Sequence, residues 1–168
     1  NVVLRLNTDA GLYGLGEFPL AYGSGREASI AMLKELVEGY VLGADPLAIE
    51  AMWHTLFRRT FWAQGGGPVV YGGMSVIDCA LWDIKGKALN VPVYELLGGR
   101  VRDRVACYCH LRGQHGDDPA PILADAQERV AEGWKYLRWG LPDGGGCLEP
   151  GRAVRQSLQQ FEALRGAL

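Results

Sequence analysis

The order of predicted elements changes once along the chain, and this change limits the folds that the chain can adopt. Up to Gly99 the sequence predicts a β-hairpin followed by helices, whereas strands and helices alternate after it. Residues 104–110 and 136–139 have the composition of strands, and helices are expected from Asp117 to Glu132 and from Glu149 onward. This order is typical of parallel βα units. We therefore place a domain boundary near Gly99.

The part before Gly99 is predicted to be a hairpin followed by three amphipathic helices. Residues 2–6 and 12–17 are the expected strands, because Asp9 and Gly11 between them favour a turn. Apolar residues then recur at intervals of three and four, which indicates helices. The helices are expected over 27–40, from Asp45 as N-cap onward, and over 74–89, with loops at 18–25 and 63–68 and Pro92 ending the third helix.

The composition is that of a soluble globular protein. The net charge is −2, which does not suit a nucleic-acid partner, and no run of about 18 apolar residues predicts a membrane span. The chain has four cysteines without a disulfide framework, and Cys79 lies in an apolar helical pattern where a buried thiol is expected. We therefore expect a cytoplasmic protein. The first residue is not Met and the last residues lie within a predicted helix, so a fragment is expected.

Two motifs resemble a known family. The segment SVIDCALWDIKGKALNVPVYELLGG (75–99) closely resembles the helix-to-barrel junction of the mandelate racemase and muconate-lactonizing branch of the enolase superfamily. The segment DAGLYGLGE (9–17) resembles the hairpin of the same family. The resemblance implies an α+β capping domain over 1–99, a β-hairpin or meander plus a helical bundle. Over 100–168 it implies the first two βα units of an incomplete (β/α) TIM-like barrel.

The resemblance also implies a magnesium ion and an enolate intermediate. In the family, three acidic residues from later barrel strands hold the ion, and a base removes the proton next to a carboxylate. A complete barrel has eight strands in about 250 residues, and the 69 residues from Arg100 to Leu168 are too few for it. The metal ligands are therefore expected outside this chain, and the chain alone is expected to be inactive. The full-length enzyme is expected to be a homo-oligomer.

Two residues near the expected strand ends are candidates for catalysis. Tyr108 and His110 share one side of a strand, as do Arg138 and Gly140. Barrel active sites form at the C-terminal ends of the strands, where His110 and Arg138 lie. The resemblance implies that His110 contacts a substrate carboxylate or transfers a proton, with Tyr108 as a substrate contact. The alternative is a hydrogen-bonded histidine with a structural role.

The residues around Arg138 distinguish between reactions of the family. Racemase-like members carry Lys-x-Lys in this stretch, and Arg138 matches the first lysine and Gly140 the second. Glycine has no proton to transfer, which argues against racemization or cycloisomerization through that lysine. Arginine at the first position resembles acid-sugar dehydratases, in which it is expected to hold a carboxylate or a developing oxyanion. The alternative is a structural ion pair.

Two segments resemble the mobile lid of the capping domain. Phe18 and Tyr22 lie in the first and Trp62 in the second, and we expect them to contact the substrate. A lid that excludes water strengthens the electrostatic interactions inside a site. The alternative is that these aromatic side chains only pack the loops down.

Other clusters of polar residues favour structural roles. Cys107, Cys109, His110 and His115 invite a zinc site, but alternation turns both cysteines away from the His110 side, and no second pair follows at zinc spacing. We expect Glu17, Asp78 and Asp83 to be structural residues of the capping domain.

The leading hypothesis is a magnesium-dependent hydro-lyase that dehydrates a small carboxylate substrate, a sugar acid. A racemase or cycloisomerase of the same superfamily is the second hypothesis. The third is a non-catalytic module that binds a partner through its exposed strand edge.

Overall fold

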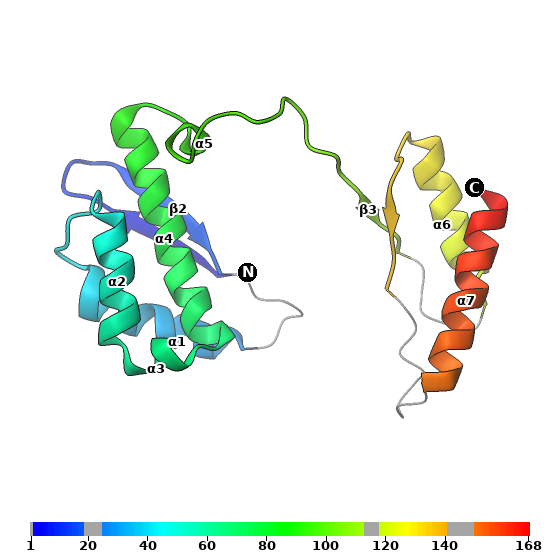
Figure 1. The fold of residues 1–168 in the computed structure, drawn as a ribbon, viewed down its shortest axis with the longest axis horizontal. Coiled ribbons are helices and arrows are strands. Elements are labelled where there is room, and N and C mark those ends of the chain that lie inside the picture. The colour runs from blue at the N-terminus through cyan, green and yellow to red at the C-terminus, as the bar shows by residue number, and fades with distance from the viewer. Residues whose placement is uncertain (1, 19–24, 113–117, 141–149) are drawn as a thin grey trace. The chain divides into compact units, whose positions relative to one another are not determined.

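In the computed structural model, residues 2–18, 25–112, 118–140 and 150–168 are described. The chain forms two compact units, Asn1–Val101 and Arg102–Leu168 (Figure 1). Among the described helices, none is both long and apolar enough to span a bilayer.

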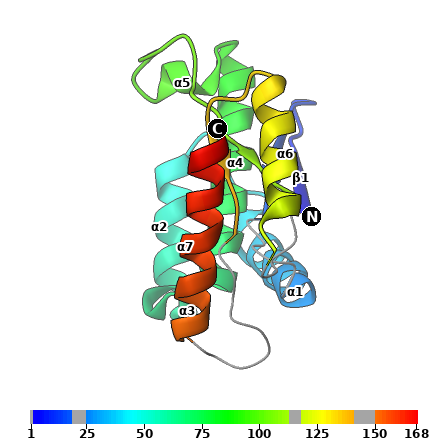
Figure 2. The ribbon, with the colours of Figure 1, turned by 90° about the vertical axis from the view of Figure 1, so that its right-hand side faces the viewer.

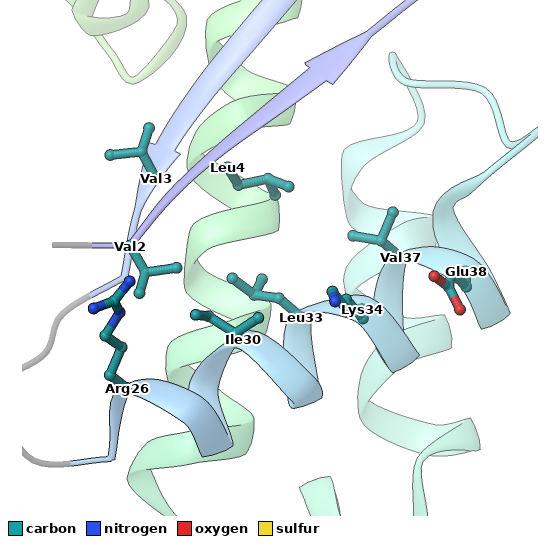
Figure 3. A pocket seen from close by; sticks show the side chains of 9 residues that line it. All are labelled: Val2, Val3, Leu4, Arg26, Ile30, Leu33, Lys34, Val37 and Glu38. Atoms are coloured by element: carbon teal, nitrogen blue, oxygen red, sulfur yellow. The ribbon is translucent and has the colours of Figure 1, made fainter.

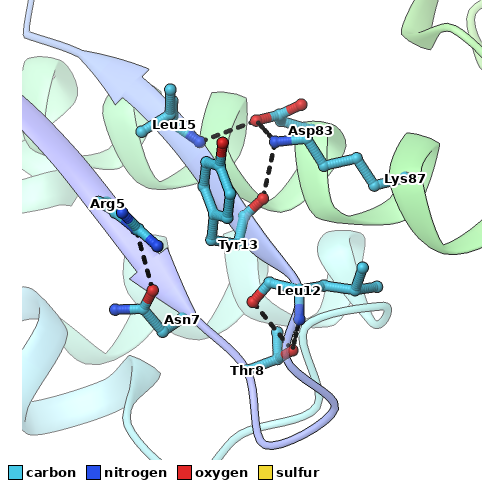
Figure 4. Close-up of polar contacts among 8 residues, drawn as sticks. All are labelled: Arg5, Asn7, Thr8, Leu12, Tyr13, Leu15, Asp83 and Lys87. Atoms are coloured by element: carbon cyan, nitrogen blue, oxygen red, sulfur yellow. Dashed lines mark hydrogen bonds and ion pairs between the residues drawn. The ribbon is translucent and has the colours of Figure 1, made fainter.

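The first unit begins with the predicted hairpin. Strands β1 (Val3–Asn7) and β2 (Tyr13–Glu17) pair antiparallel, with Val3 opposite Glu17 and Asn7 opposite Tyr13. The turn between them is closed by Thr8, whose hydroxyl donates to the carbonyl of Leu12 and accepts from its amide, both at 3.1 Å (Figure 4). Gly11 has a φ of 79°, which is the left-handed region that favours glycine.

The hairpin packs directly on helix α4 (Pro68–Leu89), the longest helix of the unit. A Cβ atom at Gly14 would lie 1.9 Å from the carbonyl oxygen of Ala80, and one at Gly16 would lie 2.1 Å from that of Val76. No side chain fits at either position. The Gly-Leu-Gly pattern of the sequence is therefore explained by the close approach of β2 to the backbone of α4.

Polar contacts hold the same strand against the C-terminal half of α4. The carboxylate of Asp83 accepts hydrogen bonds from the amide of Leu15 at 2.9 Å and from Nζ of Lys87 at 2.7 Å (Figure 4). Lys87 also donates to the carbonyl of Tyr13 at 2.8 Å. Burial alone raises the pKa of Asp83, but the bonds from Lys87 and Leu15 outweigh it and lower the pKa. The predicted structural role of Asp83 is confirmed.

The remaining helices of the first unit surround α4. Helix α1 (Arg26–Leu36) continues into the π-helical segment η2 (Val37–Val41). Helices α2 (Ile49–Arg59) and α3 (Phe61–Gly65) precede α4, and α5 (Val93–Leu96) follows it. The apolar stripe of α4 is buried in the core, namely Val76, Ile77, Ala80, Leu81 and Ile84.

Three expectations for this unit were wrong. Asp45 does not cap α2: its carboxylate accepts from the amide of Leu47 at 2.9 Å and forms a separate turn, so the helix begins at Ile49. The segment 63–68 is not a loop, because α3 extends to Gly65 and α4 begins at Pro68. Cys79 is exposed, because it lies on the side of α4 opposite the buried stripe.

The end of α4 also differs from the expectation. The helix ends because Asn90 adopts a left-handed conformation with a φ of 54°, and the amide of Val91 then bonds back to the carbonyl of Gly86 at 2.9 Å. Pro92 lies beyond this cap and does not terminate the helix.

The second unit has the predicted strand–helix–strand–helix order. Strands β3 (Cys109–His110) and β4 (Leu137–Arg138) pair in parallel, with His110 opposite Arg138. Helix α6 (Ala120–Ala131) connects them and α7 (Pro150–Ala167) follows. The two helices pack side by side on one side of the strand pair (Figures 1 and 2).

Both strands are shorter than the sequence predicted. Among the described residues, two backbone hydrogen bonds flank the register pairs, from the amide of Cys109 to the carbonyl of Tyr136 at 3.1 Å and from the amide of Leu111 to the carbonyl of Arg138 at 2.7 Å. Residues 104–107 have no strand beside them in the described part of the chain. Because a strand is defined by its pairing, the regular ladder is confined to this short stretch.

Candidate active site

Side chains of the two parallel strands alternate between two faces. Leu111 packs into the core of the second unit with Ile122 of α6 and Leu164 of α7, and Leu137 and Trp139 pack against the same cluster. Tyr108, His110 and Arg138 lie on the opposite face and are exposed. We call these three residues the helix-free face.

The structure brings the three residues of the helix-free face together. Nη1 of Arg138 donates a hydrogen bond to the hydroxyl of Tyr108 at 2.8 Å, and its guanidinium carbon lies 5.6 Å from the centre of the Tyr108 ring. The rings of Tyr108 and His110 are 5.6 Å apart between centroids and tilted by 50°. A permanent cation, an imidazole and a phenol therefore share one small surface.

The chain direction places this surface at the carboxyl ends of the strands. His110 is the last residue of β3 and Arg138 the last of β4, and the two are partners in the parallel register. Parallel strands that are joined by a helix end at the same edge of a sheet, where ligands of α/β proteins bind. Such a surface suits a small carboxylate, which a guanidinium can pair through two oxygens.

The surroundings of Arg138 differ from those of a structural arginine. Arg129 on α6 pairs with Asp125 at 3.2 Å and with Glu132 at 2.6 Å, and its side chain is only 11% exposed. Arg138 has no acidic partner among the described residues, and its guanidinium contacts the hydroxyl and the ring of Tyr108. The alternative of a structural ion pair for Arg138 is therefore not realised within the described part of the chain.

Sequence analysis did not single out Asp125, which links the end of β3 to α6. Its carboxylate accepts a hydrogen bond from the amide of Arg112 and another from Arg129. The bond from Arg112 is the main cause of a pKa below the usual value for Asp125. An aspartate at the fourth position before an arginine on a predicted helix is the signal that could have found this pair.

Phe18, Tyr22 and Trp62 were predicted to form the lid, and the structure describes them to different extents. Phe18 is 3% exposed and lies against α4, where a Cβ atom at Gly72 would lie 2.4 Å from the Phe18 ring. It packs in the core, as the alternative for these aromatic residues proposed, and a substrate contact would require it to leave this position. Trp62 lies in α3, and only its backbone is described. Tyr22 lies outside the described residues.

A separate groove of about 420 Å³ lies between β1 and α1 (Figure 3). Its floor is apolar and includes Leu4, Ile30 and Leu33, and Arg26 and Lys34 lie at its rim. None of the residues predicted to form the site lines it.

The described residues do not provide a magnesium site. Over residues 2–18, 25–112, 118–140 and 150–168, no three His, Cys, Asp or Glu residues are grouped closely enough to hold a metal ion. Magnesium needs carboxylate ligands in near-octahedral geometry, so the residues present do not fit it. We assign no step of the reaction to a metal held by these residues.

Comparison with known proteins places the chain in a family. The sequence profile of the mandelate racemase / muconate lactonizing enzyme N-terminal domain matches residues 1–98. D-galactonate dehydratases from Verminephrobacter eiseniae and Xanthomonas axonopodis pv. citri are 38% and 39% identical to the chain over 164 residues. Each match covers 98% of this chain and 41% of the relative, so the chain spans about two fifths of their length.

A solved structure supports the same assignment. A member of the enolase superfamily from Salmonella Typhimurium is 36% identical and superimposes with a TM-score of 0.83, over 99% of this chain and 47% of that one. The profile match covers more than half of the chain, and it includes the 9–17 motif and the 75–99 motif up to Gly98. The chain therefore belongs to the mandelate racemase and muconate lactonizing enzyme family of the enolase superfamily.

Proposed function

We propose that this chain contributes the capping domain and the start of the barrel of a magnesium-dependent sugar-acid dehydratase. On this proposal residues 1–99 are the capping domain and residues 100–168 are the first two βα units of a TIM-like barrel. The magnesium ion is assigned to side chains other than those described here. The complete enzyme is a homo-oligomer, as the resemblance implies, and its cysteines without a disulfide framework favour the cytoplasm.

The observation that carries the proposal is the helix-free face. An arginine without an acidic partner in the described residues, a histidine and a tyrosine hydroxyl meet at the ends of two parallel strands. In a closed barrel the face away from the helices lines the interior, and the strand ends form the active site. The names of the similar dehydratases add D-galactonate as the first substrate to test.

The proposed reaction removes water from two adjacent carbons of the sugar acid. The proton on the carbon next to the carboxylate leaves to a base, and its electron pair forms an enolate. The hydroxyl group on the following carbon then leaves and takes up a proton as water. The enol that remains converts to a 2-keto-3-deoxy acid. No oxidant is needed.

Three residues of this chain have specific roles in the proposed reaction. Arg138 pairs with the carboxylate, and because charge builds on the carboxylate oxygens as the enolate forms, a fixed cation there stabilises the transition state. His110 lies beside it and can hold a carboxylate oxygen or exchange a proton with the substrate. Tyr108 accepts a hydrogen bond from Arg138 beside the same ligand.

Racemization or cycloisomerization is the second candidate reaction. In racemase-like members of the family the second lysine of Lys-x-Lys is the usual base, and the matching position here is Gly140, which has no side chain to accept a proton. This observation favours dehydration. A non-catalytic module is the third candidate, and the reading frame beyond Leu168 tests it, because an enzyme needs acidic residues at later strand ends.

A substrate panel tests the proposal. The protein would be expressed from its full reading frame and incubated with magnesium and a panel of sugar acids that includes D-galactonate, D-gluconate and D-mannonate. We expect one of them to give a 2-keto-3-deoxy acid, detected as its semicarbazone, and chelation of magnesium to abolish the signal. The proposal is wrong if no member of the panel gives a keto acid.

A further inference from the structure

Tyr108 contacts both other residues of the helix-free face. Its hydroxyl accepts the hydrogen bond from Nη1 of Arg138 at 2.8 Å, and its ring lies 5.6 Å from the guanidinium carbon and 5.6 Å from the ring of His110. We propose that Tyr108 is a positioning residue, which holds the guanidinium plane of Arg138 so that its remaining donors face the substrate carboxylate. This inference rests on the proposed function of the site.

Arg138 needs such support because of where it lies. It is exposed at the end of a two-residue strand, and the next residue on its face, Gly140, offers no side chain. Within the described residues no carboxylate pairs with it. A long, exposed side chain samples many rotamers, and only a fixed guanidinium plane can pair two carboxylate oxygens at once. The contacts with Tyr108 restrict that plane.

A tyrosine directly before the neighbouring strand β3 suits this role. Its ring has two torsion angles and is stiff, and its oxygen can accept a bond from the guanidinium without removing the positive charge. The bond uses one of the five N–H donors of Arg138 and leaves four for a ligand.

The first test measures how firmly Arg138 is held and does not depend on activity. The protein from the full reading frame would be treated with phenylglyoxal, which labels arginine, and the label at Arg138 would be quantified by peptide mass spectrometry with Arg129 as internal reference. Tyr108→Phe keeps the ring and removes the acceptor, so we expect faster labelling of Arg138. Tyr136→Phe, an exposed tyrosine just before β4, is the matched control and should leave the rate unchanged.

The second test asks whether Tyr108 acts through Arg138. Tyr108→Phe should lower kcat by about tenfold, the usual scale for a hydrogen bond to a charged group, with a smaller change in KM. In an Arg138→Lys background the same change should have almost no further effect, since a lysine has no guanidinium plane to orient. Melting temperature should not change in either background.

The outcomes separate the positioning role from the proposed function. Equal labelling of Arg138 in the wild type and in Tyr108→Phe would overturn the inference. Faster labelling with independent, multiplicative effects of the two substitutions on kcat would also overturn it, because Tyr108 would then act by itself. A wild-type protein without dehydratase activity would refute the proposed function, and the labelling result would still decide whether Tyr108 holds Arg138.

Discussion

Two arginines of the second unit illustrate how neighbouring groups determine a residue's role. Arg129 is surrounded by Asp125, Glu128 and Glu132 and ties α6 together, whereas Arg138 is exposed and bonded to a phenol. Both are arginines near the end of an element, so composition and spacing cannot tell them apart. Their contacts do, because a cation that is already paired with carboxylates has little capacity left for a substrate.

This difference predicts the effect of substitution at position 138. In the enzyme from the full reading frame, Arg138→Lys should lower turnover almost as much as Arg138→Ala, because lysine keeps the charge and loses the planar fork. The loss of one such donor costs on the order of 100-fold in kcat. Arg129→Ala should instead lower the melting temperature and leave turnover per folded molecule unchanged. Near-normal turnover in Arg138→Lys, together with a large fall in melting temperature, would make Arg138 structural.

We expect two aspartates of α4 to make the stability of the fold depend on pH in opposite directions. Burial, followed by repulsion from Glu50, raises the pKa of Asp78, whereas the bonds from Lys87 and Leu15 lower that of Asp83 despite burial. Asp83 therefore stabilises the fold above its unfolded pKa, and this contribution is lost as the pH falls through its folded pKa. The contribution of Asp78 to stability is fully present below the pKa that it has in the unfolded chain. This contribution is lost as the pH rises through the pKa of Asp78 in the folded protein.

Substitution by asparagine separates the two cases. At pH 7, Asp83→Asn should lower the free energy of unfolding and Asp78→Asn should raise it, and both differences should shrink toward pH 3. Urea unfolding followed by circular dichroism at a series of pH values measures this. A destabilised Asp78→Asn at pH 7 would show that its carboxylate is held by an interaction stronger than its burial.

At the scale of elements, the sequence predicted the hairpin, α4 and the alternation after Gly99, because these depend on local periodicity. It missed α3, which has only five residues and ends in glycines, and it placed the start of α2 at Asp45, where the aspartate forms a turn instead. It could not give the length of β3 and β4, because strand length depends on a partner far along the chain. Arg138 and His110 could be placed by alternation, but the bond from Arg138 to Tyr108 needed the structure.

The contact between β2 and α4 gives a matched pair of glycine substitutions. Gly14→Ala places a methyl group against the carbonyl of Ala80, so strand and helix must separate, and we expect the free energy of unfolding to fall by about 1–3 kcal/mol. Gly39 lies in η2 with open space around its Cβ position, so Gly39→Ala should be neutral or stabilising by up to about 1 kcal/mol. Chemical denaturation of both variants measures the contrast, and equal effects would show that the close approach does not constrain Gly14.

At the scale of the whole molecule, the two units differ in how completely they bury their apolar residues. The first has an extended core around α4, whereas among the described residues the core of the second consists of four buried apolar residues. Val154, Leu158 and Phe161 of α7 remain at least half exposed. Exposed apolar surface of this kind marks a site that another segment or partner covers.

Limited proteolysis of the 168-residue chain tests this contrast. We expect the chain to aggregate or to be cut first after Gly99, while the first unit resists digestion, because local stability follows the number of buried apolar contacts. Mass spectrometry of the fragments locates the cuts. A monodisperse chain that resists protease throughout and melts in one cooperative transition would contradict the prediction.

A single NMR time course tests the proposed dehydration directly. The protein from the full reading frame would be incubated with magnesium and D-galactonate in D₂O, and proton spectra would be recorded as the reaction proceeds. We expect the signals of the substrate to disappear as those of a 2-keto-3-deoxy acid appear, with deuterium at the carbon that lost its hydroxyl. Loss of the signal from the proton next to the carboxylate, without any keto acid, would show exchange or racemization and would contradict the account.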